Sequence, residues 1–266
     1  MTSSDGAHWS AWQRLAAIDE GHYQISIADR AKAGVALNYH PRGKGLNWRT
    51  NLYYLETTDL GQSWHAADRR NVTVPLAKPN NPALVHDYEK EGLLVYLKDI
   101  RFDGTGQPII LFITSKGYQS GPQNGPRTWT TAQWTGRQWR IRPAFTSDNN
   151  YDMGSLYLEA NGTWRIVGPT ETGPQPYNPG GEMAMWVSSD QGTTWRKTSQ
   201  ITANSAFNHT YARHPLRAHE DFYALWADGH GREPSPSSIY FCDKTGQAYR
   251  LPRSITSDSM KPERVN

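Results

Sequence analysis

The stretch Ser188-Ser189-Asp190-Gln191-Gly192-Thr193-Thr194-Trp195 predicts a tight turn between two antiparallel strands. Its Asp carboxylate can accept hydrogen bonds from backbone N–H groups of the same turn, and its Gly can adopt a positive φ at which a Cβ would clash. The Ser and Thr hydroxyls add local hydrogen bonds, and the Trp covers the sheet edge with a large apolar side chain. Because an extended run, residues 182–187, precedes the turn, we expect a hairpin here.

The same turn occurs a second time, as Thr57-Thr58-Asp59-Leu60-Gly61-Gln62-Ser63-Trp64. Both copies read Ser/Thr-x-Asp-x-Gly-x-Ser/Thr-Trp. Weaker copies lie at residues 3–9, and simpler Gly turns lie at residues 102–106, 134–139, 160–164 and 243–246. Turns that recur between strand-like runs indicate a repeat architecture. We expect all of them to be scaffold, away from any site.

The motif resembles the Asp-box, or BNR repeat, of sialidase-like β-propellers. This resemblance implies an all-β fold of four-stranded antiparallel blades around a central channel, and strand-like runs with turns every ~8–12 residues agree with it. Sialidase-like propellers usually have six blades and related lyases seven, whereas about four to five can be assigned here. We therefore expect an N-terminally truncated six- or seven-bladed propeller, with a small closed ring as the alternative.

The repeat boundaries predict a single β-propeller domain over residues 1–255. Residues 1–18 would be the end of a blade, and residues 256–266 a polar, disordered tail. The complete blades would span residues 20–75, 85–145, 148–203 and 205–253.

Composition limits the classes of function. The 266 residues include 11 Trp and 14 Tyr but only 6 Phe, an excess of amphipathic aromatics that suits sheet edges and sugar-binding surfaces. The net charge of +3 comes from scattered Lys and Arg, which argues against a nucleic-acid surface and agrees with an anionic ligand held locally. No run approaches the length of a membrane span.

Two further features concern the cellular compartment. The single cysteine, Cys242, excludes an intrachain disulfide, and its apolar neighbours predict a buried, unreactive side chain. The N-terminus runs directly into a turn, so we expect no signal peptide in this chain. The resemblance suggests a secreted or periplasmic protein if the N-terminus is truncated.

Candidate site residues are polar side chains at the starts of expected inner strands, where a structural strand would favour Val, Ile or Phe. Such stretches are residues 20–24, 86–88, 148–152 and 208–214, and residues 38–41 end a second strand. In a propeller these positions converge on the channel. Each has a structural alternative: His22 would only bind a neighbouring loop, His86 would anchor a loop, and Arg165 would be a solvated charge.

The candidate set favours proton abstraction beside a carboxylate over glycoside hydrolysis. Retaining and inverting hydrolases typically use two carboxylates ~5–10 Å apart, and no such pair stands out. A lyase acting on a uronic acid must neutralise the sugar carboxylate, remove the C5 proton and protonate the leaving oxygen. Arg, Asn or His can do the first, and a His or Tyr can do the second and third.

The chain also resembles BNR-repeat propeller lyases that act on ulvan and rhamnose–glucuronate polymers. In those lyases a His pair from one blade and a Tyr–Arg pair from a later blade form the site. The resemblance implies catalytic roles for His22, His40, Tyr151 and Arg165. We add a set of substrate-binding candidates: His86, Asn150, Asp152, His209, Tyr211 and Arg213.

The predicted partner is an acidic oligo- or polysaccharide, cleaved by β-elimination. Two alternatives stay open: a sialidase-like exo-glycoside hydrolase, and a sugar-binding propeller without catalysis. No metal-ligand set and no cofactor site are predicted. A structural Ca²⁺ stays open because Asp-rich turns can resemble calcium loops, although no EF-hand-type ligand series occurs.

Overall fold

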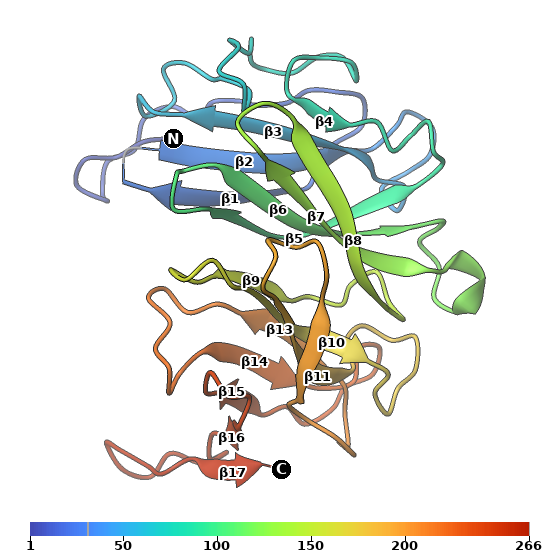
Figure 1. Cartoon of the computed structure of the whole chain (residues 1–266), viewed down its shortest axis with the longest axis vertical. Coiled ribbons are helices and arrows are strands. Elements are labelled where there is room, and N and C mark those ends of the chain that lie inside the picture. The colour runs from blue at the N-terminus through green and yellow to red at the C-terminus, as the bar shows by residue number, and fades with distance from the viewer. Residues whose placement is uncertain (31, 266) are drawn as a thin grey trace. The chain divides into compact units, whose positions relative to one another are not determined.

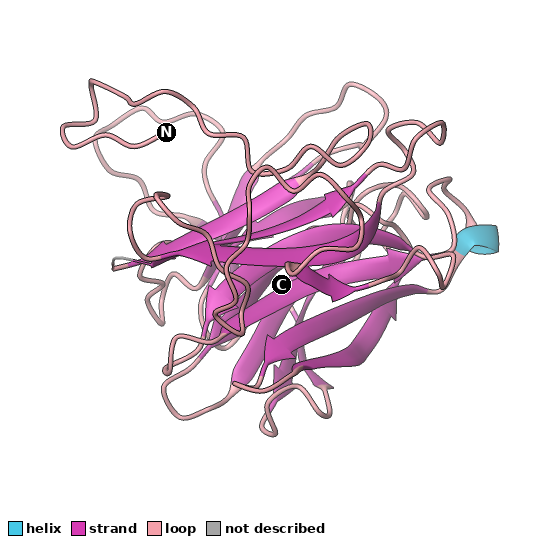
Figure 2. Ribbon diagram, turned by 90° about the horizontal axis from the view of Figure 1, so that it is seen from above, coloured by secondary structure: helices cyan, strands magenta, loops and turns pink. Residues whose placement is uncertain are grey.

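A computed structural model describes residues 1–30 and 32–265. Strands make up almost all of the regular structure, and the only helical element in this part of the chain is a single 3₁₀ turn, Pro122–Asn124 (Figure 2). The prediction of an all-β protein is therefore confirmed. No helix in the same residues is long and apolar enough to cross a membrane.

The strands form four antiparallel sheets, and in each the strands follow one another in chain order (Figure 1). The first sheet contains β1 (Gln24–Asp29), β2 (Lys32–Tyr39), β3 (Thr50–Thr57) and β4 (Leu84–His86). The second contains β5 (Leu94–Phe102), β6 (Pro108–Ser115), β7 (Arg127–Trp134) and β8 (Trp139–Ser147). The third contains β9 (Ser155–Leu158), β10 (Trp164–Glu171), β11 (Glu182–Ser188) and β12 (Arg196–Gln200). The fourth contains β13 (His209–Arg213), β14 (Ala224–Asp228), β15 (Ile239–Cys242), β16 (Ala248–Arg250) and β17 (Glu263–Val265).

Two elements differ from the expected repeat. The first blade is predicted over residues 20–75, whereas the outer strand of the first sheet is β4, which lies beyond that range. The chain between β3 and β4 forms loops in which His65 bridges Glu56 and Asn71. The tail expected to be disordered contains β17, which pairs with β16 through Ala248 and Val265.

The chain forms two compact units. Unit 1 comprises residues 1–110 and 132–140, and unit 2 comprises residues 111–131 and 141–266. Strands β6, β7 and β8 each begin in one unit and end in the other.

Each unit has a hydrophobic core made by its central strands. In unit 1 the strands β2 and β3 are buried on both faces, and Leu37, Tyr53 and Leu55 belong to one cluster with Leu76. In unit 2 the cluster includes Met185 and Trp226. Cys242, on β15, is fully buried in that cluster, and burial raises the pKa of its thiol to about 12. It is buried, as the sequence predicted.

The two predicted turns have the same hydrogen bonds. Asp59 Oδ1 accepts the Ser63 N–H at 2.9 Å, and its Oδ2 accepts the Ser63 hydroxyl at 2.6 Å. Asp190 makes the equivalent bonds to Thr194 at 2.9 and 2.7 Å. The glycines that follow have φ of 86° and 78°. The local turn chemistry is as expected, and each turn is held together by groups within eight residues of chain.

These carboxylates are held in their ionised form. Hydrogen bonds from Thr194 lower the pKa of Asp190 to about 2, and hydrogen bonds from Ser63 lower the pKa of Asp59 further. The cause is that donors favour the charged acceptor. The carboxylates of the two turns are therefore negatively charged, and they accept hydrogen bonds from their own turns.

Candidate functional site

The candidate site of unit 1 is built around Asn38, near the end of β2. Its side chain is fully buried: Oδ1 accepts the Tyr23 N–H at 3.0 Å, and Nδ2 donates to the Val95 carbonyl at 2.9 Å. Its own carbonyl accepts a bond from His22. One residue of β2 thus holds the segment before β1 against both β2 and β5.

A β-bulge lies beside Asn38. The β2–β3 register passes from Leu37 opposite Tyr53 to Tyr39 opposite Thr50, which leaves one extra residue on β3. Asn51 lies in this bulge with a φ of 58°, a conformation that Asn tolerates better than most residues. Bulges bend a strand and redirect its side chains. Here the bulge lies near the start of β3, close to Arg49, which directly precedes that strand.

The imidazole of His22 is held by two backbone groups. The Ile18 N–H donates to Nε2 at 3.1 Å, so Nδ1 carries the proton and donates to the Asn38 carbonyl at 2.9 Å. Burial lowers the pKa of His22 below 6.5. Both nitrogens of this neutral ring therefore have backbone partners. This agrees with the alternative in which His22 only binds neighbouring backbone.

His40 lies beside His22 and has a different environment. Its side chain is 1 % exposed, and its Nδ1 has no hydrogen-bond partner among the described residues. Burial lowers its pKa, and the charge of Arg49 lowers it further. The Tyr23 ring meets the imidazole edge-on, with 5.1 Å between ring centroids. The two predicted histidines are thus brought together, both as neutral rings.

Tyr23 is the member of this cluster that reaches solvent. It is 47 % exposed, and the Arg49 guanidinium lies 4.2 Å from its ring centroid. The other face of that guanidinium lies 4.7 Å from Tyr96. A cation over a phenol ring is attracted by the negative face of that ring. The cluster therefore combines an exposed phenol, a fixed cation and two neutral imidazoles.

His86, on β4, lies in the same unit but contributes to a loop. Its Nε2 contacts Glu91 Oε1 at 2.5 Å, and its ring centroid is 4.4 Å from that of Tyr88. Both partners follow it closely in the chain. The contacts of His86 match the loop-anchoring alternative.

The Tyr151 loop lies in unit 2 and is tightly hydrogen-bonded. Asp152 accepts the Asn149 N–H at 3.0 Å and the Gly180 N–H at 2.9 Å, and Asn150 Nδ2 donates to the Gly117 carbonyl at 2.8 Å. Both side chains are buried, whereas Tyr151 is exposed at a shallow hollow of about 310 Å³. This hollow also contains Tyr118 and Arg232.

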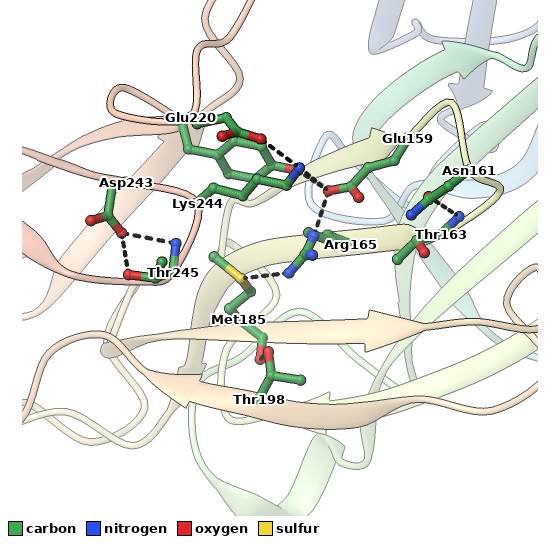
Figure 3. Close-up of polar contacts among 11 residues, drawn as sticks. Glu159, Asn161, Thr163, Arg165, Met185, Thr198, Glu220, Asp243, Lys244 and Thr245 are labelled. Carbon is green, nitrogen blue, oxygen red and sulfur yellow. Dashed lines mark hydrogen bonds and ion pairs between the residues drawn. The ribbon is translucent and has the colours of Figure 1, made fainter.

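Arg165 lies at another hollow, and the structure does not bring it to Tyr151. Its Nε contacts Glu159 Oε1 at 2.5 Å, an oxygen that also accepts the Tyr223 hydroxyl at 3.0 Å (Figure 3). Lys244 Nζ lies 3.7 Å from the same oxygen and 3.2 Å from Glu220.

The hollow beside Arg165 has a volume of about 530 Å³, and acidic side chains outnumber basic ones on its wall. Its charged residues are Arg165, Lys244, Glu220, Asp221 and Asp243. Because Arg165 is already paired and acids surround it, this hollow does not favour an anionic sugar.

His209 belongs to a buried hydrogen-bonded chain. Trp226 Nε1–H donates to Nδ1 at 2.9 Å, so Nε2 carries the proton and faces Ser205 Oγ at 2.9 Å. That hydroxyl donates to Glu182 at 2.8 Å. Burial lowers the pKa of His209. Its Nε2 is a donor here, so this imidazole cannot deprotonate Ser205 in the observed arrangement.

Tyr211 and Arg213 lie on β13 and touch each other. The Arg213 guanidinium is 5.2 Å from the Tyr211 ring, which is 51 % exposed. Tyr211 has a φ of 60°, and the β13–β14 register shifts beside it. The two side chains therefore lie on the same side of β13.

Arg49 was absent from the predicted set. It begins a strand-like run directly after Trp48, and the sequence signal was its charge at a position that a buried strand would give to an apolar residue. Within residues 1–30 and 32–265, no three His, Cys, Asp or Glu side chains are grouped to hold a metal ion.

Comparisons with known proteins identify structures with a similar fold. No protein-family model matches the sequence, and no curated protein matches it. Among solved structures, an ulvan lyase described as a new family of polysaccharide lyase superposes with a TM-score of 0.64 at 16 % identity, over 84 % of this chain and 51 % of that one. The same lyase bound to -[GlcA(1-4)Rha3S]- gives a TM-score of 0.62 at 16 % identity and the same coverage.

A different kind of enzyme also superposes. A β-fructofuranosidase from Schwanniomyces occidentalis gives a TM-score of 0.50 at 9 % identity, over 95 % of this chain and 49 % of that one. At these identities the likeness shows the fold. The chain spans about half the length of the ulvan lyase and of the β-fructofuranosidase.

Proposed function

We propose that this protein acts on carbohydrate, as a lyase that cleaves a uronic-acid-containing polysaccharide by β-elimination. One observation carries the proposal: the exposed phenol of Tyr23 lies under the Arg49 guanidinium and against the neutral imidazole of His40. The likeness to an ulvan lyase bound to a glucuronate-containing oligosaccharide supports it. We also propose that the four sheets are blades of a β-propeller with Asp-box turns, of which this chain is a part.

The proposed roles follow from exposure. The Tyr23 oxygen is the group that a polysaccharide can reach, so it removes the C5 proton and then returns that proton to the leaving oxygen. Arg49 stabilises the negative charge that spreads from C5 onto the carboxylate as the proton leaves. The C4–O bond then breaks, and the leaving oxygen takes up a proton. The products are an unsaturated uronate and a new chain end.

His40 and His22 are positioning residues in this scheme. His40 packs against Tyr23 and keeps the cluster free of a second positive charge, since its pKa is lowered. His22 fixes the backbone between residue 18 and Asn38. Tyr151 and Arg165 stay predictions for a second polar region in unit 2.

The test is a lyase assay that follows the ultraviolet absorbance of the unsaturated product. Tyr23→Phe removes the hydroxyl but keeps the ring that Arg49 covers. We expect kcat to fall by about 10²- to 10⁴-fold with an unchanged melting temperature. Tyr118→Phe is the matched control, because Tyr118 is 43 % exposed against 47 % for Tyr23, and it should keep full activity.

Three other outcomes would each reject this assignment. Loss of activity in Tyr151→Phe but not Tyr23→Phe would move the chemistry to unit 2. Release of free sialic acid without an unsaturated product would support the hydrolase alternative. Binding of acidic polysaccharide without turnover would support the sugar-binding module, which the burial of His40 and the exposed Trp9 and Trp12 favour.

A further inference from the structure

Unit 1 contains a second hollow, which is separate from the His22–His40 cluster. It measures about 640 Å³, the largest volume among the hollows described for residues 1–30 and 32–265. One wall is the indole of Trp134, a residue that packs edge-on against Trp139. The other side chains that line it and carry polar groups are Lys32, Glu56, Thr58, His65, Asp68, Arg69, Thr105 and Gln107.

One side of the hollow is fixed by an ion pair. Lys32 Nζ lies 2.6 Å from Glu56 Oε2, donates to the Gly106 carbonyl at 2.8 Å, and lies 4.6 Å from the ring centroid of Phe102. The Tyr54 hydroxyl donates to the same Glu56 oxygen at 2.5 Å. The ammonium group therefore has its contacts within the protein, and the Glu56 side chain is held in one orientation.

Several polar groups around the hollow remain open. The second oxygen of Glu56, Oε1, has no hydrogen-bond partner among the described residues, and it is absent from the buried, unsatisfied atoms. The side chains of His65, Gln107, Thr58 and Arg69 also lack a hydrogen-bond partner within the described part of the chain. An acceptor, an imidazole, an amide, a hydroxyl and a guanidinium thus surround one space beside an indole.

Arg69 is presented by a strained loop. Its φ is 67°, a region that side chains other than Gly and Asn rarely adopt. The loop is closed by hydrogen bonds from Arg69 N–H to the Ala66 carbonyl and from Ala66 N–H to the Arg70 carbonyl, both 2.9 Å. Backbone strain of this kind is concentrated at binding and catalytic sites.

We propose that this hollow binds an uncharged sugar residue. An apolar indole beside several hydrogen-bonding groups matches a ring with hydroxyls on its edge and C–H groups on its face. The formal charges of the lining cancel, because Lys32 and Arg69 face Glu56 and Asp68. Asp68 is in addition paired with Arg70 at 2.5 Å. The open oxygen of Glu56 selects a hydroxyl donor and would repel a sugar carboxylate placed against it.

This site is independent of elimination at Tyr23. It would hold a neutral residue of a polysaccharide on the side of unit 1 that contains the loop after the Asp59 turn. The protein would then bind the polymer at two places, and the second place would raise the residence time of the chain without taking part in the reaction.

The test is calorimetric titration of the full chain with methyl α-L-rhamnoside and methyl β-D-xyloside as neutral probes, and sodium glucuronate as the charged probe. Arg69→Gly removes the guanidinium at a backbone conformation that glycine favours. Arg217→Gly is the matched control, because Arg217 also has a positive φ, 61°, and lies in unit 2. Gln107→Ala is the second variant in the hollow.

We expect a neutral glycoside to bind, and Arg69→Gly and Gln107→Ala each to weaken that binding by about tenfold, the effect of one hydrogen bond. Arg217→Gly and Tyr23→Phe should bind like the wild type. The proposal is overturned if no neutral glycoside binds, if both hollow variants bind normally, or if only glucuronate binds. Lyase activity is read separately, so either proposal can fail without the other.

Discussion

The imidazole of His22 joins two backbone groups, one four residues before it and one sixteen residues after it. It accepts from Ile18, which is fully buried, and donates to Asn38. Removing one partner of a buried hydrogen bond leaves the other group with neither a protein partner nor water. The free-energy cost of that unsatisfied group exceeds the net stabilisation that the bond contributed. Residue 22 must therefore both accept and donate a hydrogen bond, which no aliphatic side chain can do.

His22→Ala should lower the free energy of unfolding by about 1–3 kcal/mol, because buried backbone groups lose their partners. Urea unfolding at pH 8 measures this. His8→Ala, at a side chain that is 91 % exposed, should change stability by less than about 0.5 kcal/mol. Equal stability of the two variants would show that the His22 bonds do not hold the segment.

The same residue predicts a pH dependence. The folded pKa of His22 is lowered by burial from 6.5, so protonation favours the unfolded state. The stability contributed by the neutral ring is complete above pH 6.5 and is lost as the pH falls from there toward the folded pKa. Between pH 7 and 5 the wild type should lose more stability than His22→Ala. Parallel curves would contradict the assignment.

The turn carboxylate of Asp190 has the same sign of linkage to pH as His22, but in a more acidic range. Its folded pKa, about 2, lies below the ordinary value of 3.8, so the ionised form stabilises the turn above pH 4. That contribution should disappear as the pH falls from about 4 to 2. Asp190→Asn should therefore differ from the wild type at pH 6 and converge with it near pH 2, as followed by thermal unfolding. A constant difference at all pH values would exclude this cause.

At the scale of elements, close packing beside β9 leaves no room for a side chain at Gly154. A Cβ there would lie 2.7 Å from the Val167 carbonyl oxygen and 2.9 Å from the Trp129 ring. Neither neighbour is the free end of a flexible side chain, since one is backbone of β10 and the other a buried indole. The glycine is thus required by the distance between β9, β10 and the Trp129 ring.

Gly154→Ala should cost about 1–3 kcal/mol of stability, the usual range for overpacking a core. Gly104→Ala is the matched control, because a Cβ at Gly104 meets nothing within 4 Å and its φ is not positive. That variant should stay within about 0.5 kcal/mol of the wild type. The comparison uses thermal melts, and similar losses in both variants would show that backbone freedom is the cause.

The strands and turns could largely be predicted from local sequence. Alternating runs and turns such as Asp59 and Asp190 are set by bonds within a few residues, which a single sequence displays. Strand β4 could not, because its pairing with β3 joins Leu52 to His86 across a long loop. Nor could the site: Asn38 and Arg49 act through contacts with residues distant in the chain, such as Val95 and Tyr96.

At the scale of the whole molecule, unit 1 is discontinuous in sequence. Residues 132–140 belong to it, and Trp139 packs edge-on against Tyr54 at 5.6 Å. Trp134 is buried in the same unit. A segment that ends at residue 110 lacks both indoles. The first 110 residues therefore do not contain all of the packing that unit 1 needs.

A fragment of residues 1–110 should not unfold cooperatively, because the apolar surface of Tyr54 and its neighbours would be exposed to water. Near-ultraviolet circular dichroism during a urea titration measures this, with the full chain as the control. A sharp transition in the fragment would show that the first sheet is sufficient for a stable core.

Cys242 offers a way to watch the protein open. Its thiol is fully buried within the β13–β17 sheet and its pKa is raised, so an alkylating reagent can attack only molecules in which that sheet has parted. Because the sequence contains one cysteine, the fraction of molecules whose mass increases on alkylation gives the fraction that has opened. No added label or substitution is needed. The rate of alkylation at Cys242 therefore reports how often the β13–β17 sheet opens.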